Sequence, residues 1–313
     1  MMSIPETLSV RQGMVVVIGS INADYIVRVA RRPDPGETVS DGVLEVHPGG
    51  KGANQAVAVA RCGARVKLVA RVGDDRIGAT RLAELHAEGV DAGSVRVTAD
   101  TATGAAFITV TPDGQNAITV APGANSALTS QDIDAEAEIL QDVDVLVAQL
   151  EVPIETVMHA VGIAGPDVTV VLNCAPFQRL PGALLSRLDV LVANEIEGAA
   201  LCGWPVDSVD DALRAAREIR QLGPSAVVLT LGAAGAVVVG PDCETSVATP
   251  AADVVDTTGA GDAFVGALAA CLTTGMHLEP ATRFAVAVGS ATTETVGALP
   301  RISGELLELF GMV

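Results

Sequence analysis

The sequence VVDTTGAGDAFVGAL, residues 254–268, joins a glycine turn to an apolar run, with a lone acid between them. Gly259 and Gly261 allow a turn that residues with side chains disfavour. The apolar run predicts a buried helix over about residues 261–272. The free N–H groups and positive dipole end of that helix would point into the turn, an arrangement that binds phosphate groups.

Asp262, the lone acid in the first turn of this helix, has two explanations. A carboxylate beside an anion hole can accept the proton of an attacking hydroxyl, while backbone amides stabilise the charge on a migrating phosphoryl group. First-turn acids also occur because they interact favourably with the helix dipole, at about 0.3–1 kcal/mol each. The local pattern leaves both explanations open.

Continuous apolar runs elsewhere predict the buried strands of a parallel sheet that is covered on both faces. They lie at residues 14–21, 65–73, 142–150, 167–173, 188–194 and 225–232. Helical patterns lie between them, for example at residues 77–89, 153–165 and 208–223. The alternation of strands and helices predicts an α/β fold with right-handed crossovers.

Two segments, residues 25–46 and 104–120, alternate polar and apolar residues instead, with turns at PDPGE and TPDGQ. They predict half-exposed antiparallel strands of a small separate sheet. The chain contains no internal repeat and no low-complexity linker. Its 313 residues therefore suit one domain, residues 1–313, with this sheet as an appendage.

Composition argues against several classes of partner. A net charge of −19 and 2% aromatic residues disfavour nucleic acid, which requires a basic footprint or a stacking platform. Five scattered cysteines predict reduced core thiols in a cytoplasmic protein. The first thirteen residues lack the pattern of a signal peptide, and the apolar runs are too short to span a bilayer. We therefore expect no membrane partner.

Common catalytic motifs are absent from the sequence. Gly50-Lys51 is followed by Gly52, so the stretch is not a P-loop, and the glycines at 259 and 261 lack the third glycine of a dinucleotide fingerprint. The four histidines show no metal spacing, and no nucleophile elbow or zinc-type cysteine set occurs.

The second glycine-rich stretch, HPGGKGANQAVAVARCG, covers residues 47–63. Its glycines let the backbone approach a ligand closely, and Lys51 and Asn54 supply donors. Sugar hydroxyls require such a fixed mixture of donors and acceptors. The alternative is a glycine-rich turn capped by Asn54.

Polar residues at the ends of predicted strands are further candidates, because α/β folds bind ligands at that edge. Asn22 and Asp24 follow the first strand, and Glu151 follows another; an Asx turn and a solvated loop acid are the alternatives. Asn194 and Glu197 have the spacing of a helix cap, whereas Glu197 could also hold water on Mg²⁺. Residues 230–239 have the pattern of a hairpin, whose small residues could flank a nucleotide.

Together and in this order, these stretches resemble the PfkB carbohydrate-kinase family, and within it the ribokinase branch. GGKGANQAVA and DTTGAGDAFVGAL are similar to its two long signatures, and GSINAD, APGAN, QLE, NCAP, NEIE and TLGAAG to its short ones. The likeness runs from about residue 15 to residue 300. It implies a doubly wound, mostly parallel sheet flanked by helices, with a small β-sheet lid. It also implies ATP-dependent phosphorylation of a sugar, with the 5-hydroxyl of D-ribose as the first expectation.

The resemblance implies a role for each motif residue. Asp262 would be the catalytic base, beside an anion hole made by the amides of Gly259, Ala260 and Gly261. The sugar would be held by Asn22, Asp24, Gly50, Lys51, Gly52, Asn54 and Glu151. MgATP would lie against Asn194, Glu197, Thr230, Gly232, Gly235, Gly261 and Val286. A monovalent cation, usually K⁺, would lie among Asp256, Thr258, Thr292, Thr295, Gly297 and Arg301.

Two positions depart from the family pattern. Val286 stands where related kinases often carry Asn or His near the adenine, and Arg301 where a small hydroxyl residue often completes the cation shell. The resemblance also implies a homodimer formed through the lid.

Other functions remain open at this point. The same chemistry could act on deoxyribose, fructose, a ketodeoxy-sugar acid or a nucleoside. The scarcity of aromatic residues argues against a nucleoside, whose base usually requires a stacking partner. A non-catalytic sugar or nucleotide sensor is the alternative from another class, and the presence of Asp262 with an intact glycine turn argues against it.

Overall fold

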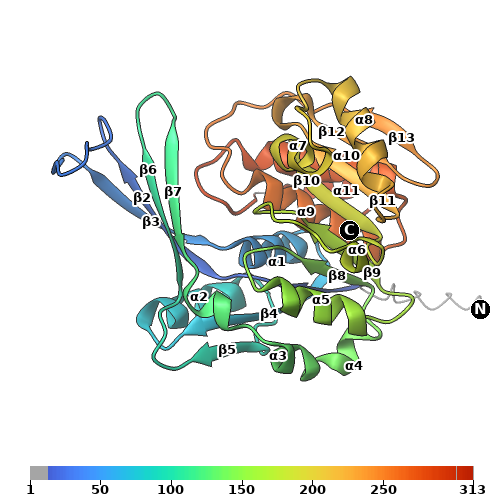
Figure 1. Cartoon of the computed structure of the whole chain (residues 1–313), viewed down its shortest axis with the longest axis horizontal. Helices are drawn as coiled ribbons and strands as arrows, with labels where there is room; N and C mark the ends of the chain where they lie inside the picture. The colour runs from blue at the N-terminus through green and yellow to red at the C-terminus, as the bar shows by residue number, and fades with distance from the viewer. Residues whose placement is uncertain (1–12, 301, 313) are drawn as a thin grey trace, which may run out of the picture.

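The structure, a computed structural model, describes residues 13–300 and 302–312. Nine strands of these residues form one sheet in the order β13-β12-β11-β10-β9-β8-β1-β4-β5 (Figure 1). The strands are β1 (Met14–Ile18), β4 (Arg65–Gly73), β5 (Val95–Thr98), β8 (Val145–Ala148), β9 (Thr169–Asn173), β10 (Val190–Asn194), β11 (Ala226–Thr230), β12 (Ala236–Val239) and β13 (Glu244–Val247). Neighbours from β11 to β5 run parallel, whereas β12 and β13 are antiparallel additions at one edge.

Helices cover both faces of this sheet, as the continuous apolar strands predicted. Along β1, Val15 and Val17 enter one core, and Val16 and Ile18 enter the other. The first core includes residues of α1 (Lys51–Arg61), α2 (Arg76–Ala87), α9 (Ala260–Thr273) and α10 (Leu278–Thr292). Helix α11 (Gly304–Leu309) packs against the same core. The second core includes residues of α3 (Ser130–Asp134), α4 (Ala137–Leu140), α5 (Ile154–Ile163), α6 (Gly182–Leu185) and α8 (Val209–Arg220), and α7 (Glu195–Cys202) packs against it. The expected doubly wound α/β fold is confirmed.

The local signals for strands and helices were accurate. Every apolar run that was predicted as a strand contains a strand of the large sheet. The helices predicted at residues 77–89, 153–165, 208–223 and 261–272 are α2, α5, α8 and α9. Helix α8 begins where expected, because the Ser208 side chain accepts a hydrogen bond from the N–H of Asp211. Two short 3₁₀ helices, η1 (Gly123–Ala127) and η2 (Gly232–Ala234), complete the connections.

A second sheet of four strands, which we call the small sheet, projects from the body (Figure 1). Its order is β3 (Val43–Gly49), β2 (Asn22–Arg28), β6 (Gly104–Val110) and β7 (Asn116–Ala121). The pairs β2–β3 and β6–β7 are antiparallel as predicted, but the central pair β2–β6 is parallel. Both central strands start at the body, where Asn22 pairs with Gly104, and both run outward, so the two hairpins meet with the same direction.

The end of the first strand was predicted wrongly. β1 stops at Ile18, so Asn22 and Asp24 lie on β2 of the small sheet and not at the end of β1. The chain leaves the large sheet early because the start of α1 packs directly on it: a Cβ added at Gly52 would lie 2.6 Å from the nitrogen of Ser20.

All five cysteines are free, and Cys62, Cys174 and Cys271 are buried, which agrees with the expected core thiols. In the described part of the chain, no helix combines the length and the apolar character needed to cross a membrane.

Helices α1 and α9 touch closely, and this contact brings two distant parts of the chain together. At Gly266 of α9, an added Cβ would lie 2.5 Å from the Cβ of Ala58 and 2.6 Å from the carbonyl oxygen of Gln55, both on α1. Real Cβ atoms do not approach this closely, so α9 needs a residue without a side chain at this point.

We expect Gly266→Ala to lower the free energy of unfolding by about 1–3 kcal/mol, because the added methyl group forces the two helices apart. Gly162→Ala is the matched control: Gly162 lies in α5, and an added Cβ there has no neighbour within 4 Å. The control should be neutral or gain up to about 1 kcal/mol. Denaturant titration of both variants measures the difference; equal stabilities would contradict the close contact.

Candidate active site

Polar residues collect where the strand order of the large sheet reverses. The chain passes from β1 to β4 on one side and later to β8 on the other, so β1 and β8 are neighbours at the switch point. Glu151 follows β8, and its Oε2 accepts a hydrogen bond from the Ser20 hydroxyl after β1. The same oxygen accepts the N–H of Lys51 at 3.1 Å. Glu151 is thus held at the start of α1, and it is not a solvated loop acid.

The carboxylate of Asp262 is buried and held by two side-chain amides of α1. Asn54 Nδ2 donates to Oδ2 at 2.9 Å, and Gln55 Nε2 donates to Oδ1 at 3.0 Å. Only 8% of Asp262 is exposed. Asn54 therefore does not cap α1, which begins at Gly50 without a side-chain cap. The interaction explains why an acid can stand at the start of a buried helix: its partners come from α1.

Gln55 extends this contact into a buried amide network that the sequence analysis missed. Its Nε2 also donates to Asn173 Oδ1 at 3.1 Å, and its Oε1 accepts from Gln149 Nε2 at 2.6 Å. These three residues stand in the motifs GGKGANQ, QLE and NCAP, so the signal was present but no role was assigned. The network fixes the rotamer of Gln55 and, through it, the orientation of Asp262.

Lys51 lies among four carboxylates. Burial alone would lower the pKa of Lys51, but the negative charges of Asp262, Glu151, Glu197 and Asp24 outweigh burial and raise it. Lys51 therefore remains an ammonium at neutral pH. The electrostatic coupling brings together the residues that the resemblance assigned to the sugar with one assigned to the nucleotide.

Asp24 is the most perturbed of these carboxylates. Burial, followed by repulsion from Glu151 and Asp262, raises the pKa of Asp24 from 3.8 to about 6, although His47 and Lys51 oppose the shift. A carboxylate with this pKa changes charge in slightly acidic solution.

Asn22 is buried at the base of the small sheet. Its Oδ1 accepts from Asn125 Nδ2 at 2.7 Å, and Asn125 Oδ1 accepts the N–H of Ile21 at 2.9 Å. Asn125 lies in the motif APGAN and was given no role in the sequence analysis. It connects η1 to the point where the small sheet leaves the body.

The first turn of α9 is open to an anion. Gly259 precedes the helix in the left-handed conformation, with φ 75°. The N–H of Ala260 donates to Thr257 O at 3.3 Å, whereas the amides of Gly259, Gly261 and Asp262 have no hydrogen-bond partner among the described residues. Nothing lies within 4 Å of a Cβ added at Gly261. Of the three amides predicted for the anion hole, two are therefore available and one closes a turn.

Asn194 and Glu197 form the capping box that the spacing predicted. The N–H of Glu197 donates to Asn194 Oδ1 at 2.8 Å, and the N–H of Asn194 donates to Glu197 Oε2 at 2.9 Å. Oε1 of Glu197 accepts no hydrogen bond from the described residues. Burial raises the pKa of Glu197, against the effects of the Asn194 N–H and Lys51. Glu197 Oε1 could therefore accept a hydrogen bond from a water molecule that is bound to Mg²⁺.

The described residues contain no cluster of three or more His, Cys, Asp or Glu side chains that could hold a metal ion. A resident ion held by side chains alone does not fit this site. Mg²⁺ that takes most of its ligands from water and from nucleotide phosphates does fit.

Residues 230–235 form the predicted hairpin between β11 and β12. The N–H of Leu231 donates to Gly235 O at 2.8 Å, and the strands pair antiparallel from Thr230 to Ala236. Val286 lies on α10 within the first core and is 6% exposed. The roles of Thr230, Gly232, Gly235 and Val286 toward a nucleotide remain predictions.

Asp256 ties together the two loops assigned to a monovalent cation. Its Oδ1 accepts the N–H and hydroxyl of Thr258 at 2.9 and 2.7 Å, and its Oδ2 accepts the N–H of Gly297 at 3.0 Å. Burial opposes the effect, but these donors lower the pKa of Asp256. Thr292 is buried on α10, and its hydroxyl donates to Val288 O. Arg301 lies outside the described residues.

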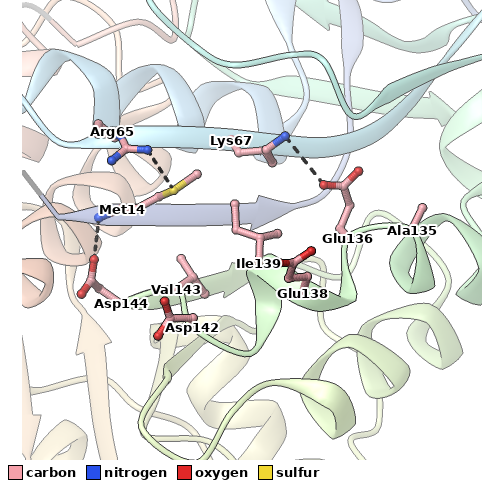
Figure 2. A pocket seen from close by; sticks show the side chains of 10 residues that line it. All are labelled: Met14, Arg65, Lys67, Ala135, Glu136, Glu138, Ile139, Asp142, Val143 and Asp144. Carbon is pink, nitrogen blue, oxygen red and sulfur yellow. Dashed lines mark hydrogen bonds and ion pairs between the residues drawn. The ribbon is translucent and has the colours of Figure 1, made fainter.

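A cavity of about 580 Å³ lies at the opposite edge of the sheet (Figure 2). Met14 and Arg65 begin β1 and β4 there, and Met14 N–H donates to Asp144 Oδ2 at 2.7 Å. Lys67 Nζ lies 3.7 Å from Glu136 Oε2. The cavity is therefore separate from the residues around Asp262, which lie at the carboxyl ends of the strands.

Comparison with known proteins identifies the family. Residues 12–302 match the model of the pfkB family carbohydrate kinases. The chain belongs to this family. Members phosphorylate a sugar hydroxyl and use ATP with a divalent metal ion, so the protein is a phosphotransferase.

Several family members are similar over most of the chain. A ribokinase of Haemophilus influenzae is 38% identical, over 90% of this chain and 92% of its own. A deoxyribokinase of Salmonella typhi is 36% identical, over 82% and 84%. A bifunctional ribokinase/ribose-5-phosphate isomerase A of Fructilactobacillus sanfranciscensis is 37% identical over 91% of this chain, which spans about half (53%) of that protein. The structure of Arabidopsis thaliana ribokinase complexed with ribose and ATP superposes with a TM-score of 0.87, at 31% identity, over 95% of this chain and 98% of that one.

The pKa of Asp24 generates a pH prediction. If Asp24 holds sugar hydroxyls as the resemblance implies, we expect kcat/KM for the sugar to fall as the pH drops through about 6, because a protonated carboxyl group is a weaker hydrogen-bond acceptor. Titration of Asp24 does not itself unfold the protein at low pH: its pKa is higher in the folded chain than the ordinary 3.8, so protonation of Asp24 stabilises the fold. Asp24→Asn should remove this step from the pH profile. A wild-type profile that is flat between pH 5 and pH 7 would contradict the assignment of Asp24.

Proposed function

We propose that this protein is a ribokinase, which transfers the γ-phosphoryl group of ATP to the 5-hydroxyl of D-ribose and releases ADP. The observation that carries the proposal is the carboxylate of Asp262, held by Asn54 and Gln55 beside the open amides of α9. The chain acts as one kinase domain with the small sheet as its lid. Free cysteines suit a cytoplasmic enzyme.

Asp262 acts as the general base in this proposal. Asn54 Nδ2 and Gln55 Nε2 each donate to one of its oxygens, and they hold the carboxylate in place in the first turn of α9. The sugar hydroxyl gives its proton to Asp262 as its oxygen attacks phosphorus. The amides of the α9 turn stabilise the charge on the transferred group without reorganisation.

The sugar lies between the lid and the start of α1 in this proposal. Asp24 and Glu151 accept hydrogen bonds from its hydroxyls, and Asn22 and Asn54 complete the set. Asn54 supports the assignment: its Oδ1 is buried without a partner among the described residues, although its Nδ2 is bound to Asp262. A ligand hydroxyl would satisfy that oxygen. Gly50, Lys51 and Gly52 bring the backbone close to the same space.

The nucleotide lies across the carboxyl ends of β10 and β11. Glu197 holds water on Mg²⁺, which neutralises the phosphates. Asn194 stands beside it, and the hairpin residues Thr230, Gly232 and Gly235 border the nucleotide, with Val286 nearby.

Asp262→Asn should lower kcat by about 10²–10⁴-fold or more while sugar binding largely survives. Gln55→Met should lower kcat less, because it removes only one of the two donors that orient the base. Coupled-assay kinetics and sugar titration calorimetry separate the two effects. If Asp262→Asn keeps near-normal kcat, Asp262 is not the base.

A coupled ADP assay across a panel of acceptors tests the substrate. Ribose should give the highest kcat/KM, ahead of 2-deoxyribose, fructose, a ketodeoxy-sugar acid and a nucleoside. The similarity to a deoxyribokinase makes 2-deoxyribose the decisive comparison, because the two sugars differ by one hydroxyl. A higher kcat/KM for 2-deoxyribose than for ribose would show that 2-deoxyribose is the acceptor and ribose is not. Binding without turnover would support a sensor instead.

K⁺ is proposed to lie between residues 256–258 and 292–297, where Asp256 already joins the two loops. A fixed cation there orders the turn that carries the α9 amides. We expect kcat to rise when KCl replaces choline chloride at constant ionic strength, and Asp256→Asn to lose most of this activation. Equal rates in both salts would exclude the cation site.

The lid is proposed to form a homodimer. Large apolar side chains of the small sheet are about half exposed or more: Val43, Leu44, Val46, Phe107, Ile118 and Val120. Such a concentration on one appendage is typical of an interface. Ile118→Asp should give a monomer by light scattering, whereas Leu309→Asp, at a still more exposed position on α11, should leave the dimer intact. A monomeric wild type would overturn this proposal.

A further inference from the structure

A second cavity, of about 250 Å³, lies between α1 and α2. Of the residues proposed above for the sugar and the nucleotide, only Asn54 lines it. Its walls are mostly apolar: Ile21, Ala53, Val57, Leu85 and Leu299. Four polar side chains line it as well, namely Asn54 from α1, Arg81 and Glu84 from α2, and Glu88 just after α2.

Arg81 is the unusual feature of this cavity. It is 9% exposed, and its Nη2 donates to Glu84 Oε1 at 2.8 Å. Its Nε and Nη1 are buried with no hydrogen-bond partner in the described ranges, and neither is Glu84 Oε2 paired. A buried guanidinium with unsatisfied donors is costly, so such groups are ordinarily paired. Donors and an acceptor therefore face the same apolar cavity without protein partners.

The chemistry of the cavity selects one class of ligand. A guanidinium pairs best with a carboxylate, and the unpaired oxygen of Glu84 requires a donor such as a hydroxyl. A phosphate dianion is disfavoured more than a singly charged carboxylate, because Glu84 and Glu88 both line the cavity and repel the larger negative charge more strongly. The apolar walls suit a short hydrocarbon chain, and the volume is below the range of drug-sized pockets.

We propose that this cavity binds a small hydroxycarboxylic acid as an effector of the enzyme. Its carboxylate pairs with Arg81, its hydroxyl donates to Glu84, and its hydrocarbon part contacts Val57 and Leu85. The sequence analysis assigned no role to these residues.

The cavity touches three parts of the active site, which is why its ligand acts as an effector. Asn54 lines it and also donates to Asp262. Pro48 and Gly49, at the rim, end the strand β3 that carries the lid back to the body. Leu299 follows the loop that Asp256 holds through Gly297. A ligand in contact with all three changes the affinity for the sugar, and the sugar changes the affinity for the ligand equally.

Titration calorimetry on the full chain without sugar or nucleotide tests the site directly. The probes are L-lactate and 2-hydroxyisovalerate. Acetate, which lacks the hydroxyl group, and glycerol, which lacks the carboxylate, are the control compounds. We expect a hydroxy acid to bind, and Arg81→Met to weaken it about tenfold to hundredfold. Arg76→Met, an exposed position on the same helix, should bind like the wild type. Met fills the apolar cavity, and thermal unfolding checks that both variants fold.

Two results would overturn the proposal. One is the absence of binding by every probe at millimolar concentration, with only ordered water in the cavity of a crystal. The other is binding that Arg81→Met leaves unchanged. These results do not depend on which sugar is phosphorylated, so failure here is distinct from failure of the proposed function. The effector role requires that a bound probe shift the sugar KM in the wild type and not in Arg81→Met; an unchanged KM would refute it.

Discussion

The candidate active site depends on one buried interaction, the pair of amide hydrogen bonds from Asn54 and Gln55 to Asp262. Asn54 and Asp262 are 208 residues apart in sequence, so the interaction exists only because α1 and α9 pack at very short distance. Gly266 and Ala58 permit that distance. The position of the Asp262 carboxylate therefore depends on the small residues at the contact between the helices. If α1 and α9 packed further apart, Asp262 would lose both of its hydrogen-bond donors at once.

Charge balance is the second constraint. Four carboxylates surround Lys51, and each of them raises the pKa of that ammonium. The converse holds for Asp24, whose pKa rises because burial and two neighbouring carboxylates disfavour its charged form. One half-buried cation therefore stabilises a set of acids that would otherwise repel one another. Such an arrangement of charges is costly, and it is found most often at functional sites.

Local sequence predicted what local interactions determine. Continuous apolar strands specified the covered parallel sheet, and the spacing of Asn194 and Glu197 specified a cap that forms within four residues. Features that depend on long-range contacts could not be predicted from the sequence in the same way. The end of β1 depends on the packing of Gly52, the parallel pair β2–β6 depends on where two hairpins leave the body, and Gln55 acquires its role from Gln149 and Asn173. Local patterns proposed several candidate residues, but their roles came from a resemblance to a family, because no helical or strand period indicates that Asn54 meets an acid 208 positions away.

The open amides at the start of α9 have a kinetic consequence when they are set beside the net charge of −19. Partial charges on backbone groups act over a few ångströms, whereas the field of the whole protein repels an anionic nucleotide at longer range. Encounter with MgATP is therefore slowed before the helix end can attract it. Added salt screens the repulsion over distances beyond about 10 Å, so moderate ionic strength should speed capture of the nucleotide, the reverse of what proteins with basic clefts experience.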